Sequence, residues 1–239
     1  MKKNIEFIVL WAVLLFIGLT LFNFIHECGH GFGAQLDGTH ISTGFNQVGD
    51  IGKKPSDPNF RSETLETGIL NSSGLLGPFT NWILAILLTV LLYKRSKTNV
   101  LTLIIGAAAV SNALNRLAGV IPFFTGALRN KVRMADEVEW GLKAIKQLNF
   151  PMSMDKFRPI TDSQPALILS NPRIYFWPTV SVAISLICFY FAYRKLFKEF
   201  KEQLHSKLLC WIFGLMPILM GAGMFITAAK LDNLIRINW

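Results

Sequence analysis

Apolar and polar positions fall into long separate blocks along this chain. Five blocks are almost wholly apolar and about 20 residues long, which is the length that a helix needs to cross the hydrocarbon core of a bilayer. These blocks cover residues 5–25, about 73–93, about 100–124, 174–193 and 208–229. The pattern predicts an all-α membrane protein, a polytopic helical bundle of about five transmembrane helices.

Two polar stretches interrupt the apolar blocks. Residues 37–66 are rich in Gly, Pro, Asp and Ser, which is typical of an irregular loop. Residues 125–172 contain a short helical pattern whose apolar positions share one face, with lysines between them: Val138, Leu142, Ile145 and Leu148. We expect this amphipathic helix to lie at the membrane surface.

Composition supports a membrane environment and bears on the partners. Of the 239 residues, 51% are hydrophobic and 16% are charged, whereas about a quarter are charged in soluble domains. The net charge of +9 comes from Lys and Arg beside the apolar blocks, where they set orientation and meet anionic lipid. The expected partner of these charges is therefore the lipid bilayer and not nucleic acid. Three cysteines, in or beside apolar blocks, indicate no disulfide framework.

Orientation follows from basic residues in the short loops. A cytoplasmic N-terminus would place ten of them inside: Lys2, Lys3, Lys94, Arg95, Lys97, Arg194, Lys195, Lys198, Lys201 and Lys207. This distribution favours an inside N-terminus with five spans, and it puts the end of the first block on the far side. Arg129, Lys131 and Arg133, close to the third block, favour the opposite orientation.

A zinc-protease motif, His26-Glu27-Cys28-Gly29-His30, follows the first block. The two histidines are one helical turn apart, so both imidazoles project from one face and can ligate one ion. Glu27 is placed to take a proton from a water molecule that the metal activates. Ionisable residues inside a membrane are costly, so three within five positions favour a functional site over a polar cap on the span.

The third metal ligand must come from elsewhere in the chain. The position six residues after His30, where extended zinc-protease motifs carry a histidine, is Leu36. Asp37 lies about 10 Å along the helix axis from His30, which is too far for one ion. His40 follows a glycine and is expected in a loop.

Further motifs carry a resemblance to a known family. Gly77-Pro78-Phe79-Thr80-Asn81 opens the second block, Asn112 and Asn115 lie late in the third, and Asp136 follows. With the histidine motif, these resemble the site-2 protease family of intramembrane zinc proteases over roughly residues 5–140. The resemblance implies a Zn²⁺ cofactor held by His26, His30 and Asp136. It also implies catalytic roles for Glu27, Asn115 and Asn112, and substrate binding by Asn81 and Gly77.

Several of these residues have structural alternatives. Asp136 with Glu139 reads as a capping box at the start of the amphipathic helix, and Glu137, Glu139 and Glu66 are other candidates for the third ligand. Asn112 and Asn115 suit hydrogen bonds between helices. Arg116 is most simply a side chain that snorkels to the interface from the end of its helix, and the alternative is that it pairs with the carboxylates of the active site.

The sequence thus predicts a membrane-embedded zinc metalloendopeptidase of the cell membrane, cleaving a peptide bond within or next to a membrane segment of a protein or peptide substrate. Its parts would be a protease-like core (1–136), a surface segment (137–172) and two additional C-terminal spans (173–239). Two alternatives stay open. One is a prenyl-processing type of membrane zinc protease, which takes a Glu as third ligand. The other is a non-enzymatic bundle that binds membrane partners. The sequence names neither the substrate nor the oligomeric state.

Overall fold

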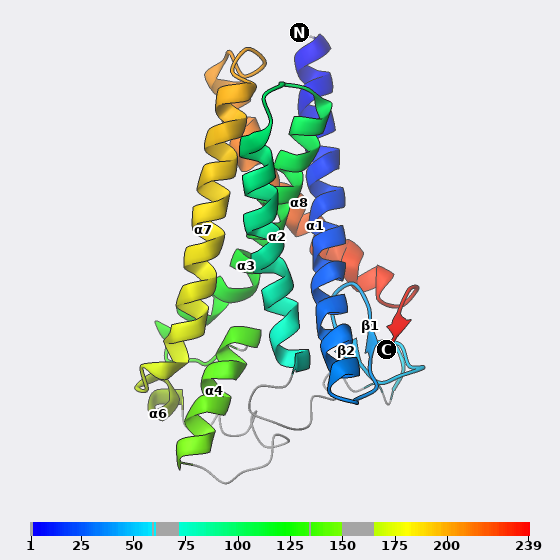
Figure 1. Ribbon diagram of the computed structural model, residues 1–239, viewed down its shortest axis with the longest axis vertical. Helices are drawn as coiled ribbons and strands as arrows, with labels where there is room; N and C mark the ends of the chain where they lie inside the picture. The colour runs from blue at the N-terminus through cyan, green and yellow to red at the C-terminus, as the bar shows by residue number, and fades with distance from the viewer. Residues whose placement is uncertain (1, 59, 61–71, 134, 150–164) are drawn as a thin grey trace.

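The computed structural model describes residues 2–58, 60, 72–133, 135–149 and 165–239. It is a bundle of long helices with a small sheet beside one end (Figure 1). The helices are α1 (Lys2–Leu36), α2 (Ser72–Lys94), α3 (Val100–Ala127), α4 (Asp136–Asn149), α6 (Pro165–Leu169), α7 (Arg173–Glu199) and α8 (Lys207–Leu231). The strands are β1 (Ser42–Thr43), β2 (Val48–Gly49) and β3 (Ile237–Asn238).

Within the described residues, five helices are long and apolar enough to cross a membrane, which confirms the predicted fold class. They are α1, α2, α3, α7 and α8. In the most apolar 18-residue stretch of α3, 67% of the residues are buried, whereas in the corresponding stretch of α8 only 17% are buried. Helix α3 therefore lies at the centre of the bundle, and α8 lies at its edge.

Helix α1 is longer than its apolar block. It continues through the histidine motif to Leu36 and stops at Gly38, whose φ of 71° is the left-handed conformation common just after a helix. The amide of Thr39 still donates to the carbonyl of Ala34 at 2.9 Å across this turn. The motif is therefore inside a continuous helix, about 15 Å before its end at 1.5 Å per residue from His26.

A close approach between α1 and α2 depends on glycine. A Cβ at Gly29 would lie 2.6 Å from the carbonyl oxygen of Leu76, a backbone atom that cannot move aside. A Cβ at Gly77 would collide with the imidazole of His30. These two glycines allow the motif to lie directly against the start of α2, as small residues do in membrane helix pairs.

The other end of the bundle is held by an aromatic cluster. The Trp11 ring stacks on Phe213 with centroids 4.4 Å apart, and its indole N–H donates to the carbonyl of Phe213 at 3.1 Å. Tyr193 meets Trp11 edge-on. This cluster joins α1, α7 and α8, so the two C-terminal spans pack against the helix that carries the motif.

The amphipathic helix is covered by protein. Val138 and Leu142 of α4 are buried in a cluster with Phe123 and Ile174, and the Trp140 indole donates to the carbonyl of Gly74 at 3.1 Å. These two apolar side chains therefore pack on protein and not on lipid, while the position of α4 at the membrane surface stays a prediction. The side chains of Ile145 and Leu148 lie outside the described residues.

The loop after α1 contains a small sheet that the sequence reading missed. Its strand order is β2-β1-β3, both pairings are antiparallel, and β3 comes from the end of the chain. The Trp239 indole lies over Gly31 of α1 and donates to the hydroxyl of Thr43 at 2.8 Å. The segment after α8 is thereby fixed against the helix that carries the motif.

The connections fall at two opposite ends of the bundle. The α2–α3 and α7–α8 turns lie at the end that holds the N-terminus, whereas the small sheet and α4 lie at the other (Figure 1). We expect Ser56→Cys and Ser96→Cys, two exposed positions at these opposite ends, to react differently with an impermeant thiol reagent. The background would have Cys28, Cys188 and Cys210, all free thiols, replaced.

With the N-terminus inside, Ser56→Cys is labelled in intact cells and Ser96→Cys only after the cells are opened. The reverse result would contradict the orientation that the basic loops favour. Labelling of both positions in intact cells would contradict the five-span topology itself.

A candidate metal centre

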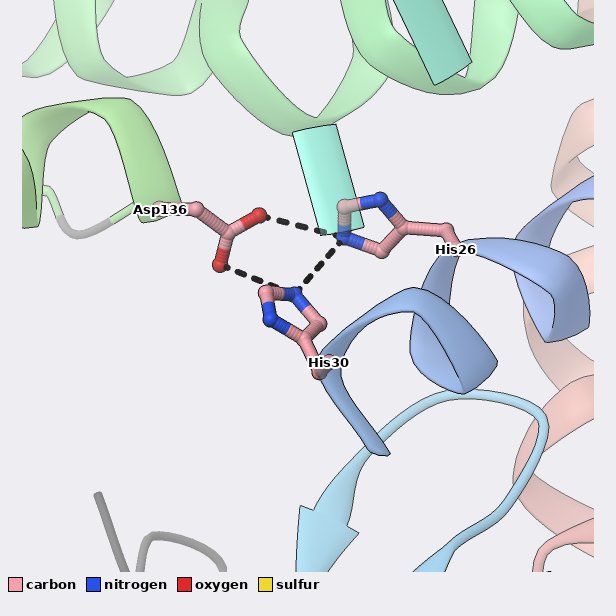
Figure 2. Close-up of side chains that lie close together, drawn as sticks. All are labelled: His26, His30 and Asp136. Atoms are coloured by element: carbon pink, nitrogen blue, oxygen red, sulfur yellow. Dashed lines mark hydrogen bonds and ion pairs between the residues drawn. The ribbon is translucent and has the colours of Figure 1, made fainter. Parts of the chain in front are cut away.

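Three side chains from two helices meet near the C-terminal end of α1. His26 and His30 lie one turn apart on α1, and Asp136 is the first residue of α4 (Figure 2). Nε2 of His26 lies 3.2 Å from Nε2 of His30 and 3.1 Å from Oδ2 of Asp136. Nε2 of His30 lies 3.7 Å from Oδ1 of Asp136. Both histidines are buried.

These spacings fit one metal ion. Tetrahedral ligands at the usual zinc–nitrogen and zinc–oxygen distances lie about 3.3–3.4 Å from one another. The three observed separations, 3.1, 3.2 and 3.7 Å, bracket that value. His26, His30 and Asp136 could therefore hold a metal ion without a large rearrangement.

Asp136 begins α4 but does not cap it. The carbonyl of Ala135 accepts the amide of Glu139 at 3.0 Å, so Ala135 is the cap residue and Asp136 is the first helical residue. The predicted capping box, in which Asp136 is the cap residue, was therefore wrong. Burial alone would raise the pKa of Asp136, but His30 and Arg116 outweigh it and hold this pKa well below its usual value. The carboxylate is therefore charged and directed at the histidines.

Arg116 is buried beside the three residues. Its Nη2 lies 3.2 Å from Oδ2 of Asp136, and its Nη1 lies 3.1 Å from Nε2 of His26. Only 6% of this residue is exposed, so the prediction that it snorkels to the interface was wrong. The signal was in the sequence, because an ionisable residue inside an apolar block marks a functional region by default.

Glu137 faces away from the histidines although it is next to Asp136. Its Oε2 accepts from Nη2 of Arg116 at 2.9 Å, and its Oε1 accepts from the hydroxyl of Ser181 at 2.6 Å. Burial raises the pKa of Glu137, although Arg116 opposes this. Neither Glu137 nor Glu139 belongs to the group that could hold a metal, and Glu66 lies outside the described residues.

Two of the three asparagines bridge helices through their side chains, whereas Asn81 takes part through its backbone carbonyl, and its Oδ1 has no hydrogen-bond partner among the described residues. The amide of Asn112 donates to the backbone carbonyl of Asn81 at 2.6 Å, and that of Asn115 donates to the carbonyl of Leu19 at 2.9 Å. All three are buried. The structure thus shows the contacts between helices that their residue type suggested, while roles in catalysis or substrate binding stay predictions. Gly77 lies against His30, as described above.

Glu27 is buried on the neighbouring face of α1, between the metal ligands and the segment after α8. The ionisable groups nearby are those of His30, Asp136, Asp232 and Arg116. No described residue forms a hydrogen bond or ion pair with the Glu27 carboxyl group, so it is not committed to a structural contact. It is available to exchange a proton.

Sequence reasoning missed the residues that close this side of the centre. Asp232, 1% exposed, accepts the backbone amides of Phe45 and Asn46, the latter at 3.1 Å. Arg236 donates to the carbonyl of Ser42 at 2.9 Å. The signal was an acidic and a basic residue one turn apart, directly after the last apolar block.

Comparison with known proteins adds no relative to these observations. No protein-family model, no curated protein and no solved structure matches this chain.

Removal of the Asp136 carboxylate should cost the metal. Asp136→Ala is expected to weaken metal binding at least ~10-fold, because two imidazoles alone cannot fill a tetrahedral site. Glu139→Ala, in the same turn of α4 but outside the three ligands, is the matched control and should keep the metal. Elemental analysis of the purified variants measures this, and full occupancy in Asp136→Ala would contradict the assignment.

Proposed function

We propose that this protein is a zinc-dependent intramembrane metalloprotease that cleaves a peptide bond within or next to a membrane segment. The observation that supports it most directly is the spacing of His26, His30 and Asp136 beside an uncommitted Glu27. Two imidazole nitrogens and one carboxylate oxygen suit zinc, and three protein ligands leave one position open. When bound there, zinc would supply Lewis-acid activation of a water molecule.

The residues of the chain would then divide the work. His26 and His30 would hold the ion through the Nε2 atoms that face each other. Glu27 accepts the proton of the attacking water and passes it to the leaving amine. Gly77 leaves room for the His30 imidazole itself, since a Cβ there would collide with its Nε2, and its role in substrate binding stays a prediction. The side-chain amides of Asn112 and Asn115 hold the surrounding helices together, the former through the backbone carbonyl of Asn81.

The depth of the site supports a membrane substrate. His26 and Glu27 lie inside the candidate span Asn4–Leu36, within a helix that is apolar over most of its length. A helical substrate shields its own carbonyls, so a cleavable segment must unwind locally before it reaches such a site. We therefore propose a membrane protein or peptide as substrate, and the cell membrane as the location of this multi-pass protein.

The alternative with a glutamate as third ligand gains no support from the site. Glu137, the nearest glutamate in sequence to Asp136, is engaged by Arg116 and Ser181 and is turned from the histidines. The geometry therefore favours Asp136 as the third ligand and the site-2 type of protease.

Glu27→Gln separates chemistry from metal binding. The amide has the shape of the carboxylate but cannot take up a proton, so turnover should fall by about 10²–10⁴-fold while zinc stays bound. The assay would follow cleavage of single-span model proteins in liposomes that contain the purified protein. Cys28→Ala, at the next position of α1, is the control and should leave the rate unchanged.

Two results would count against the proposal. Normal cleavage by Glu27→Gln would remove the general base. A wild-type protein that is loaded with zinc but cleaves none of the model proteins would favour the non-enzymatic bundle.

A further inference from the structure

A continuous path of buried polar contacts leads from helix α7 to the metal centre. The Trp82 indole donates to the hydroxyl of Ser181 at 3.1 Å, and that hydroxyl donates to Oε1 of Glu137 at 2.6 Å. Oε2 of Glu137 accepts from Arg116 at 2.9 Å, and Arg116 pairs with Asp136 at 3.2 Å. The path therefore passes from α2 to α7, then to α4 and then to α3.

Each group on this path has its direction fixed by its neighbours. The Ser181 hydroxyl has one proton, which goes to Glu137, and it accepts from Trp82. Both oxygens of Glu137 are used. Nε of Arg116 also lies 2.8 Å from Oε1 of Glu137, a charge contact in which the N–H is not aligned with that oxygen. Its planar guanidinium is thus held from one side by Glu137 and presents its remaining N–H groups to the metal centre.

Burial makes this arrangement stiff. Ser181 and Glu137 are fully buried, and Arg116 is nearly so. A buried charge without a partner is costly, so Arg116 and Glu137 cannot separate without a large penalty. Because Glu137 and Asp136 are consecutive, fixing the Glu137 side chain also fixes the start of α4 and the direction of the Asp136 carboxylate.

We propose that Arg116, Glu137 and Ser181 are positioning residues that hold the Asp136 carboxylate against His26 and His30, so that α7 is part of the metal centre. This inference rests on the proposed function. The guanidinium contacts both carboxyl groups, since its Nη2 lies 3.2 Å from Oδ2 of Asp136 and 2.9 Å from Oε2 of Glu137, so a change at Glu137 acts directly on the Asp136 carboxylate. Two carboxyl groups also share the single positive charge of Arg116, which favours a further cation at the three ligands.

The test compares two serines on one helix. Ser181→Ala should weaken zinc binding about 10–100-fold, the usual effect of losing a group that orients a ligand. Ser185→Ala is the matched control: Ser185 is also buried, one turn along α7, and lies outside the path, so its affinity should equal that of the wild type. Competition with a chelator in detergent gives the dissociation constants. The visible spectrum of the cobalt-loaded protein reports the ligand geometry and should shift in Ser181→Ala alone.

A double variant tests whether the residues act in series. Glu137→Gln should weaken zinc binding about 10-fold or more, and adding Ser181→Ala should cause no further loss, because the path is already broken. Additive losses would overturn the proposal. An unchanged affinity and cobalt spectrum in Ser181→Ala, even with a lower melting temperature, would overturn it too.

The same measurements separate this inference from the proposed function. A wild-type protein that binds no zinc would contradict the metalloprotease itself. Zinc binding by the wild type with unaltered affinity in Ser181→Ala and Arg116→Lys would contradict only the positioning role. If Arg116→Lys does not fold, the zinc affinity of Ser181→Ala alone tests the positioning role.

Discussion

The buried charge of Arg116 is the constraint on which the arrangement of this bundle depends. A guanidinium inside an apolar span has to find carboxylates in the protein, and among the described residues the start of α4 supplies them. Meeting Arg116 draws Glu137 into the interior and leaves Asp136 beside the histidines of α1. This electrostatic requirement therefore contributes to the position of α4 and brings together three residues, far apart in sequence, that could hold a metal ion.

Close packing on the other side of α1 completes the enclosure. Gly29 and Gly77 let α1 and α2 approach until backbone atoms and an imidazole are in contact. The small sheet and the segment after α8 cover the remaining side through Asp232 and Trp239. The centre is thus enclosed by α2, α3, α4 and the sheet, while the carboxyl group of Glu27 has no hydrogen-bond or ion-pair partner among the described residues.

The apolar blocks and the spacing of His26 and His30 were enough to predict the spans and two of the three residues that could hold a metal ion, because both depend on local periodicity. The environment of Asp136 could not be derived in that way. Its capping pattern is a local signal, and the contact with Arg116 depends on how two distant segments fold together. The predicted boundary between the protease-like core (1–136) and the surface segment (137–172) separates Asp136 from Glu137. Both side chains nevertheless form ion pairs with Arg116.

The contact between α7 and Glu137 could not be predicted either, because it also depends on how distant segments fold together. Ser181 sits in an apolar block with no motif around it, and only the fold brings its hydroxyl to Glu137. The small sheet was also missed, since strands of two residues leave no periodic pattern in the sequence.

X-ray absorption at the zinc edge of the purified protein tests the central claim most directly. The account predicts one zinc per chain with only nitrogen and oxygen ligands at about 2.0–2.2 Å, including two imidazoles. Absence of bound zinc, or a sulfur ligand at about 2.3 Å, would contradict it.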